Sequence, residues 1–342
     1  MKIHIQLIYT GGTIGMVKSA KSNILQPFDF KNISDNIPEL NLLDCQIDTI
    51  SFDRPIDSSD MNPNHWVEIA TIIEEHYDKY DGFVVLHGSD TMSYTASALS
   101  FMLENLSKPV ILTGSQLPIG DLRTDAKENL ITAVQLASLQ HKDEPVIREV
   151  GLYFEYKLYR GNRTTKISAD HFEAFASNNF PPLVTSGVKL IVESHLLLKN
   201  NSIDNFNAHK IMDNRVGILK LFPGITPNFL QTLTLSTNLK GLILETFGSG
   251  NATTEPWFLD IIKTIIGQGV YVINVTQCDG GRVTMGHYKT SQSLLSAGVI
   301  SGKDMTTEAA ITKLMYLLGK ETPRRSFKSV FESSIRGELT EN

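Results

Sequence analysis

The chain has 342 residues, 41% of them hydrophobic and 20% charged, which suits a globular protein of two domains with ample core material. Its formal net charge of −6 excludes the basic surface of a nucleic-acid-binding protein, and no apolar run is long enough to span a membrane. Two cysteines, Cys45 and Cys278, cannot form a disulfide framework, and the first residues alternate like a strand rather than a signal peptide. We therefore expect a cytoplasmic protein.

Strands alternate with helices along the first half of the chain. The patterns predict strands at residues 3–9, 44–52, 83–86, 110–113 and 150–156, and helices at residues 63–79, 92–103 and 125–139. This alternation predicts a doubly wound parallel sheet. After residue 156, Gly161 and Asn162 indicate a hairpin turn, with Lys166 beginning the returning strand. Four basic residues near this turn are interpreted as a solvated surface: Lys157, Arg160, Arg163 and Lys166.

The polar segment at residues 200–209 marks a shift in composition. Beyond it the pattern restarts, with strands predicted at residues 216–222, 241–246 and 270–276 and helices near residues 227, 256–266, 308–318 and 323–332. The predicted fold is therefore α/β. A larger N-terminal doubly wound sheet domain (residues 1–190) precedes a linker (191–212) and a smaller C-terminal α/β domain (213–342).

Two polar turns follow predicted strands of the first domain. One is TGGTIG at residues 10–15, where adjacent glycines let the backbone approach a ligand closely. The other is HGSDT at residues 87–91, which leads into a helix. Ligands of open α/β sheets bind at the carboxyl ends of the strands, although a serine or aspartate before a helix is equally an ordinary N-cap.

Several familiar sites are excluded by spacing. Gly248-Ser249-Gly250 lacks the third glycine of a dinucleotide-binding turn, and Gly11-Gly12 is not followed by a phosphate-loop lysine. No Gly-x-Ser-x-Gly elbow is present, and the nine histidines lack metal-ligand spacing. We expect neither a metal nor a cofactor, and interpret His87 as structural.

What remains is a set of hydroxyls and two charged groups at one sheet edge: Thr13, Ser58, Ser89, Thr91, Asp90 and Lys166. A hydroxyl becomes a nucleophile when a base takes its proton, and a lysine serves as that base when its surroundings favour the neutral amine. Asp90 would orient the lysine or hold a substrate amino group. These residues indicate a hydrolase of a small zwitterionic or anionic substrate, with Thr13 and Ser89 both competent as the nucleophile.

Four motifs in this order resemble those of the bacterial-type L-asparaginases, and most closely the cytoplasmic type I branch. They are TGGTIG (residues 10–15), DSSDM (57–61), HGSDTM (87–92) and TTK (164–166). The resemblance implies hydrolysis of L-asparagine to L-aspartate and ammonia. It also implies two α/β domains and a homotetramer built as a dimer of dimers.

The resemblance also assigns roles. Thr13 would attack the side-chain amide and form a β-aspartyl ester. Ser89, Asp90 and Lys166 would form a second hydroxyl–carboxylate–lysine group, in which Asp90 also binds the substrate's α-amino group. The loop after residue 15 would close over the substrate.

Three further assignments follow from the same resemblance. Ser58 would bind the α-carboxylate, with Ser59 beside it. Asn251 would reach the site from a partner subunit.

The sequence departs from the family pattern at three places. Ser89 stands where threonine is usual, so the methyl group that restricts the rotamer is missing, and we expect retained activity with looser geometry. A lid tyrosine is replaced at Asn23, next to Ile24. An arginine of a family allosteric site, which lies near positions matching Thr165 and Cys278, is replaced by Glu245, so we expect weak or absent activation by asparagine.

Three alternatives remain. A transfer-RNA amidotransferase subunit with this domain normally carries an N-terminal extension, whereas the first strand here begins at residue 3. A glutaminase-preferring amidohydrolase differs by one methylene in substrate, worth only ~1–3 kcal/mol of binding. A non-catalytic asparagine sensor is disfavoured because every proposed hydroxyl, Asp90 and Lys166 are present.

Overall fold

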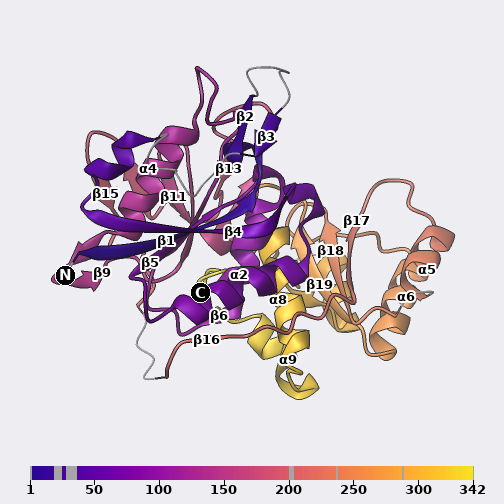
Figure 1. Ribbon diagram of the computed structural model, residues 1–342. Coiled ribbons are helices and arrows are strands. Elements are labelled where there is room, and N and C mark those ends of the chain that lie inside the picture. The colour runs from indigo at the N-terminus through magenta and orange to yellow at the C-terminus, as the bar shows by residue number, and fades with distance from the viewer. Residues whose placement is uncertain are drawn as a thin grey trace. The chain divides into compact units, whose positions relative to one another are not determined.

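The computed structural model describes residues 2–18, 25–27, 37–199, 204–235, 238–286 and 289–341. The chain forms two compact units, Met1–Lys210 and Ile211–Asn342, and the predicted α/β class with two domains is confirmed (Figure 1). The predicted linker, residues 191–212, differs from this division. Its first two residues belong to a strand of the main sheet, and residues as far as Lys210 cluster with the first unit.

One eight-stranded sheet organises the first unit, in the order β15-β14-β11-β10-β7-β5-β1-β4. Neighbours from β4 to β10 pair in parallel, whereas β11, β14 and β15 extend the sheet with antiparallel pairs. The bounds are β1 Ile3–Gly11, β4 Cys45–Ile56, β5 Gly82–Leu86, β7 Val110–Thr113, β10 Val150–Phe154, β11 Lys157–Arg160, β14 Val184–Ser186 and β15 Leu190–Val192.

Helices cover both faces of this sheet, as the doubly wound prediction required. Helix α4 (Ala126–Ala137) packs on the face that carries Leu7 and Val84. On the other face, α2 (Pro63–His76) and α3 (Met92–Met102) pack together, and Gln6 bonds His76 of α2. Every residue of β5 is buried, which explains the continuous apolar run of this strand.

The first unit also contains shorter strands and 3₁₀ turns. Paired two- and three-residue strands are β2 Met16–Lys18 with β3 Leu25–Pro27, β6 Leu103–Glu104 with β16 Asn207–Ala208, β8 Gln140–His141 with β9 Glu144–Pro145, and β12 Thr165–Lys166 with β13 Phe175–Ala176. Single 3₁₀ turns are η1 Thr13–Gly15, η3 Pro38–Leu42, η4 Ser58–Asp60, η5 Ser89–Thr91 and η6 Gly161–Arg163.

The predicted hairpin at Gly161 was wrong. The chain turns earlier, at Glu155 and Tyr156, which have φ angles of 43° and 67° and join the paired strands β10 and β11. Two residues with left-handed backbone angles between paired strands are typical of a type I′ hairpin turn, for which Asn-Gly is a strongly preferred sequence. Glu-Tyr gives no such signal. Lys166 instead lies in β12, where it pairs with Phe175.

The predicted solvated basic surface was also wrong in part. The side chains of Arg160 and Arg163 are buried, and both guanidinium groups lie over the Phe180 ring. Arg160 Nε lies 2.6 Å from Glu149 Oε2, which is also buried. The acid that neutralises this arginine comes from the far side of a hairpin, so charge patterning alone could not reveal it.

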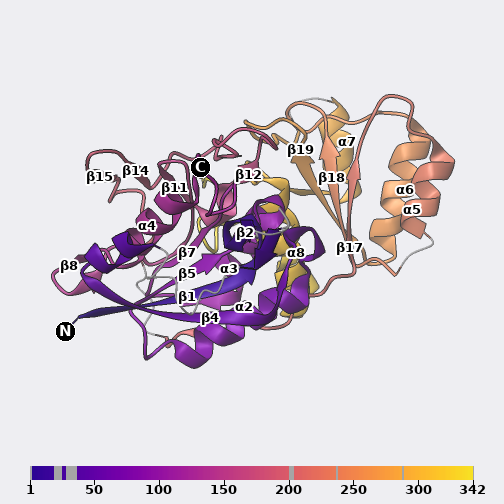
Figure 2. The same ribbon diagram turned by 45° about the horizontal axis from the view of Figure 1, so that its top comes forward.

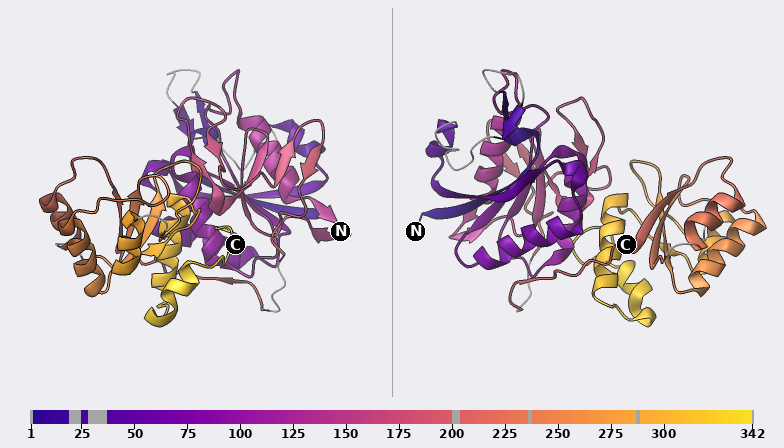
Figure 3. Two further views of the ribbon diagram at one scale, coloured as in Figure 1. Left: turned by 180° about the vertical axis from the view of Figure 1, so that it is seen from behind. Right: turned by 45° about the vertical axis from the view of Figure 1, so that its right-hand side comes forward.

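The second unit is a smaller α/β layer structure. Its sheet has the order β17-β18-β19-β20 and is parallel throughout the described residues. Helices α5, α6 and α7 share one hydrophobic core with the sheet, and α8 and α9 cover the other face (Figures 1 and 3). The bounds are β17 Val216–Lys220, α5 Pro227–Leu235, β18 Gly241–Thr246, α6 Pro256–Gly267, β19 Tyr271–Thr276, α7 Lys289–Ala297, β20 Ile300–Ser301, α8 Thr307–Gly319 and α9 Arg324–Phe331. Helix α7 and strand β20 were not predicted.

A buried lysine of the second unit forms hydrogen bonds with the C-terminal segment of the chain. Lys313 of α8 donates hydrogen bonds to the carbonyls of Phe331 and Ser333, at 2.8 and 2.6 Å, and to the buried carboxylate of Glu338. Glu338 also accepts from the backbone N–H of Arg336 at 2.7 Å. The C-terminal RGELT segment therefore stabilises the second unit.

Candidate active site

The carboxyl ends of β4, β1 and β5 lie side by side because these strands are neighbours in the sheet (Figure 2). Each strand continues into a short turn, and these turns carry Thr13, Ser58 and Ser89. The turns touch at Gly12, which has a φ angle of 87°. A Cβ atom on Gly12 would lie 2.5 Å from the backbone of Gly88, so only glycine permits this approach.

Ser58 ties two of these turns together. Its buried hydroxyl accepts a hydrogen bond from the backbone N–H of Asp90 at 3.3 Å. Its carbonyl accepts from the Thr91 hydroxyl at 2.6 Å. Ser59 points elsewhere, because its hydroxyl donates to Asp57 Oδ1 at 2.9 Å in an exposed N-cap. The sheet edge thus holds the Ser58 and Asp90 segments in one fixed arrangement.

Lys166 reaches this edge from β12. Its Nζ atom lies 2.9 Å from Ser89 Oγ and 2.6 Å from Asp90 Oδ1. The lysine side chain is 18% exposed, whereas that of Asp90 is 63% exposed. One amine therefore bridges a hydroxyl and a carboxylate, and the carboxylate keeps an open side for a ligand. The structure thus brings together Ser89, Asp90 and Lys166, the three residues that the sequence grouped as hydroxyl, carboxylate and lysine.

Gln116 completes the arrangement and was not predicted as a site residue. It follows β7, the next parallel strand, and its Oε1 atom accepts from Ser89 Oγ at 3.1 Å. Its Nε2 atom donates to the carbonyls of Ala169 and His171, at 3.2 and 3.0 Å. The position after a parallel strand was the available signal, since it places Gln116 at the same sheet edge.

His87 supports the HGSDT turn from beneath. It is fully buried, with Nδ1 2.6 Å from the carbonyl of Gly88 and Nε2 2.9 Å from Thr95 Oγ1. Trp66 Nε1 donates to the same Thr95 hydroxyl at 3.0 Å. This chain of bonds fits a neutral imidazole with its proton on Nδ1. Burial lowers the pKa of His87 to about 4, which keeps the ring neutral. His87 thus has the structural role predicted for it.

Thr13 lies at the start of η1 and is half-buried beside the Gly12–Gly88 contact. Of the segment after residue 15, which we expect from the sequence to close over the substrate, the structure describes the paired strands β2 and β3. The replaced lid tyrosine, at Asn23 and Ile24, lies outside the described residues.

Two family models together match most of the chain. The model "Asparaginase, N-terminal" matches residues 4–197, and "Glutaminase/Asparaginase C-terminal domain" matches residues 215–331. The chain belongs to the asparaginase family. The resemblance stated from the four sequence motifs is thereby confirmed.

Known relatives of this asparaginase-family chain match it over almost its full length. L-asparaginase 1 of Escherichia coli is 44% identical over 99% of this chain and 98% of that protein. The 60 kDa lysophospholipase of Mus musculus is 42% identical over 97% of this chain and 62% of that longer protein. The crystal structure of L-asparaginase I from Vibrio cholerae superposes with a TM-score of 0.90, at 41% identity, and covers all of both chains.

The remaining predicted site residues divide between the two units. Asn251, Glu245 and Cys278 belong to the second unit, and Thr165 to the first. Asn251 exchanges backbone hydrogen bonds with Phe247, at 2.8 and 2.9 Å, in the loop that follows β18.

Glu245, at the end of β18, is engaged by neighbours of its own unit. It accepts from the Thr307 hydroxyl at 2.6 Å and lies 3.9 Å from Lys220 Nζ. Cys278 is exposed, and its N–H donates to Thr276 Oγ1 at 3.1 Å.

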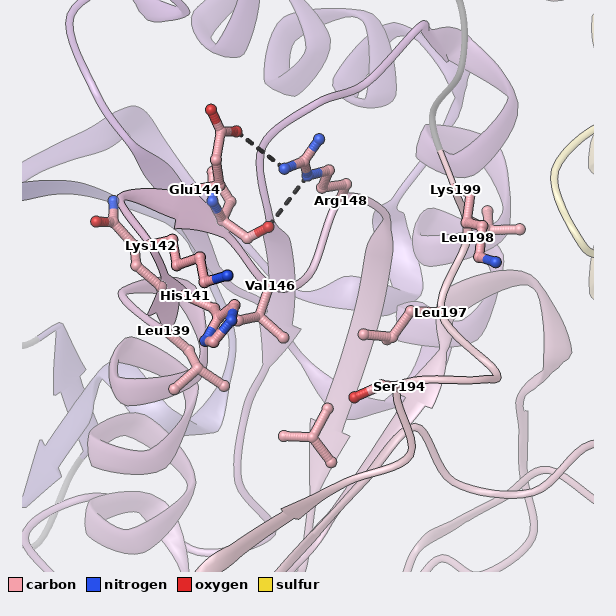
Figure 4. A pocket seen from close by; sticks show the side chains of 13 residues that line it. Leu139, His141, Lys142, Glu144, Val146, Arg148, Ser194, Leu197, Leu198 and Lys199 are labelled. Carbon is pink, nitrogen blue, oxygen red and sulfur yellow. Dashed lines mark hydrogen bonds and ion pairs between the residues drawn. The ribbon is translucent and has the colours of Figure 1, made fainter.

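A cavity of about 830 Å³ lies elsewhere in the first unit (Figure 4). It adjoins the β8–β9 hairpin, which connects α4 to the start of β10 and so lies at the amino ends of the strands. Apolar side chains such as Val146 and Leu197 line it, and Arg148 pairs with Glu144 at its rim at 2.9 Å. No predicted site residue lines this cavity.

Among the residues that the structure describes, no three or more His, Cys, Asp or Glu side chains are grouped so as to hold a metal ion. No helix in the described ranges is both long and apolar enough to cross a bilayer.

Proposed function

We propose that this asparaginase-family chain hydrolyses L-asparagine to L-aspartate and ammonia, with Thr13 as the nucleophile. The observation that carries the proposal is the position of Lys166 Nζ, within hydrogen-bonding distance of both Ser89 Oγ and Asp90 Oδ1. The relative from Escherichia coli, named L-asparaginase 1, supports the choice of substrate.

The first step forms an ester. The Thr13 hydroxyl oxygen attacks the side-chain amide carbon of asparagine, and its proton passes through the Ser89–Lys166 pair to the departing nitrogen. The C–N bond breaks, ammonia leaves, and a β-aspartyl ester remains on Thr13. A lysine fits this task because its neutral amine accepts a proton and its ammonium form returns one.

The second step hydrolyses the ester. Water gives a proton to the same pair while its oxygen attacks the ester carbon, and Thr13 recovers its hydroxyl as aspartate leaves. Asp90 suits the substrate's α-ammonium group because its carboxylate is largely exposed beside Lys166. Ser58, buried between the two turns, suits the α-carboxylate, with Ser59 at the outer edge.

We also propose that the chain works as a homotetramer built from dimers, with Asn251 contributed by a partner subunit. Asn251 lies in a different unit from Thr13, and its loop carries Phe247, an apolar side chain that is 38% exposed. Aromatic residues are enriched at protein–protein interfaces. The two free cysteines support a reducing, cytoplasmic location.

Ammonia release from L-asparagine tests the function, with L-glutamine and the Thr13→Ala variant measured in parallel. Asparagine-selective turnover that disappears in the variant supports the proposal. A preference for glutamine would make the chain a glutaminase-type amidohydrolase. Asparagine binding without turnover, measured by calorimetry, would identify a sensor.

A further inference from the structure

We propose that Gln116 is a positioning residue for asparagine hydrolysis: it directs the Ser89 hydroxyl toward Lys166 and replaces the restraint that a threonine methyl group would supply. The inference rests on the proposed roles of Ser89 and Lys166. It arises from the contacts between the turn after β5, the turn after β7 and the segment after β12.

The orientation of the Gln116 amide is fixed by its partners. Two backbone carbonyls, of Ala169 and His171, lie 3.2 and 3.0 Å from the nitrogen Nε2. Carbonyl oxygens only accept hydrogen bonds, so a flipped amide would place its own oxygen against two acceptors. The oxygen Oε1 must therefore face Ser89.

This orientation sets the direction of the Ser89 hydrogen bond. Oε1 has no proton, so Ser89 donates its single hydroxyl proton to Gln116, across 3.1 Å. The lone pairs of Ser89 Oγ are then available to the Lys166 ammonium at 2.9 Å. When Lys166 is neutral, the hydroxyl proton needs only to rotate about the C–O bond, because Oγ already lies within reach of both groups.

The backbone that carries Gln116 is itself anchored. Its N–H donates to Asp125 Oδ2 at 2.9 Å, and the N–H of Leu117 donates to the other oxygen of that carboxylate at 3.1 Å. Asp125 is buried and also binds Asn129 of α4 at 3.3 Å. Gln116 therefore holds Ser89 from a rigid turn.

Ser89 needs such a restraint more than threonine would. A threonine side chain is confined at χ1 by its methyl group, whereas serine has three staggered positions open to it. Only some of these place Oγ near Lys166. The hydrogen bond to Gln116 selects the position seen here, so its loss should matter more with serine at position 89 than with threonine.

A double-mutant cycle tests this dependence. The kcat for L-asparagine is measured for the wild type, Gln116→Ala, Ser89→Thr and the double variant. We expect Gln116→Ala to lower kcat about tenfold in the wild type, the scale of one lost hydrogen bond. In the Ser89→Thr background the same change should cost about twofold or less, because the methyl group then restrains the hydroxyl. KM should change little, since Ser58 and Asp90 keep their places.

Two further variants separate positioning from folding. Gln116→Met keeps a side chain of similar length without the amide, and we expect the same kcat loss and the same rescue by Ser89→Thr. Gln135→Ala removes an exposed glutamine from α4 and is the matched control. An equal fall in kcat in both backgrounds would overturn the proposal, since Gln116 would then act independently of the Ser89 rotamer.

The failure of this inference can be told from failure of the proposed function. If Lys166→Ala abolishes turnover while the cycle is additive, only the role of Gln116 is lost. If Lys166→Ala retains full turnover, the proposed function of the lysine fails, and the positioning role that depends on it fails with it.

Discussion

Lys166 Nζ lies 2.6 Å from Asp90 Oδ1, although the two residues are 76 positions apart in the chain. The contact depends on the β10–β11 hairpin and on the short β12–β13 pair, which together return the chain to the carboxyl end of β5. Neither feature has a strong local sequence signal. The position of the lysine is thus a consequence of long-range strand pairing.

Removing this amine should abolish the proton transfers proposed for the site. We expect Lys166→Ala to lower kcat for L-asparagine by about 10²–10⁴, the range of a general acid–base residue. Lys166→Arg should be equally inactive, because a guanidinium does not give up its proton. Lys189→Ala, on an exposed turn between β14 and β15, is the control. An active Lys166→Arg variant would contradict the base role.

The proposed sharing of each active site between two subunits predicts that inactive variants complement one another. Thr13→Ala and Asn251→Ala should each lose most activity as homo-oligomers. A heterodimer of the two variants, isolated with two affinity tags, should recover roughly half of the wild-type activity, because one of its two sites is intact. The measurement is ammonia release by the tagged pair.

Two results would argue against the shared site. Heterodimers with no more activity than the mixed homo-oligomers would place Thr13 and Asn251 in one subunit's site or deny Asn251 a role. An Asn251→Ala variant with full activity would also deny that role. The doubly tagged wild type, prepared identically, is the control.

The sequence predicted the fold well where local patterns were strong. Strand residues 110–113 and 241–246 match β7 and β18 at both ends, because their apolar runs are bounded by polar turns. The Thr13, Ser58 and Ser89 turns were also found, since each follows a predicted strand. Helix α7 was missed because its sequence, KTSQSLLSA, is mostly polar.

What the sequence could not supply is the set of partners across the sheet. The amide of Gln116 bridges Ser89 and the segment after Lys166, and no local sequence pattern predicts this contact. The sequence predicts Arg160 as a surface charge, whereas its side chain pairs with the buried Glu149. Both interactions join residues from different strands, and periodicity carries no information about such pairs.

Glu245 predicts simple saturation by asparagine. Its carboxylate lies beside Thr307 and near Lys220. The α-carboxylate of a second, activating asparagine would therefore be repelled by the like charge of Glu245. We expect initial rates to depend hyperbolically on asparagine concentration, with a Hill coefficient of about 1. A sigmoidal curve would contradict this expectation, and Glu245→Gln would then show whether the charge has any influence.

The buried Arg160–Glu149 pair predicts an unequal response to single and double replacement. Glu149→Ala leaves a buried guanidinium without this carboxylate, and we expect the free energy of unfolding to fall by about 3–5 kcal/mol. It also removes the acceptor for Leu198 N–H, now at 2.8 Å. Replacing both residues by methionine removes both charges, so the double variant should lose less than Glu149→Ala. Urea denaturation measures the difference, and a double variant less stable than the single one would refute the argument.

The buried His87 predicts a loss of stability in mild acid. Burial lowers its pKa in the folded chain to about 4, whereas the unfolded chain has the ordinary value of 6.5. Between these values the unfolded form binds a proton that the folded form does not, so the free energy of unfolding falls as the pH falls from 6.5 toward 4. At pH 5 the loss should be about 2 kcal/mol relative to pH 7, since one pKa unit corresponds to about 1.4 kcal/mol.

His87→Gln cannot titrate, so its urea midpoint should change less between pH 7 and pH 5 than that of the wild type. The exposed His141→Gln variant should keep the wild-type dependence. If the His87→Gln and wild-type midpoints fall equally, His87 is not the group that binds the proton.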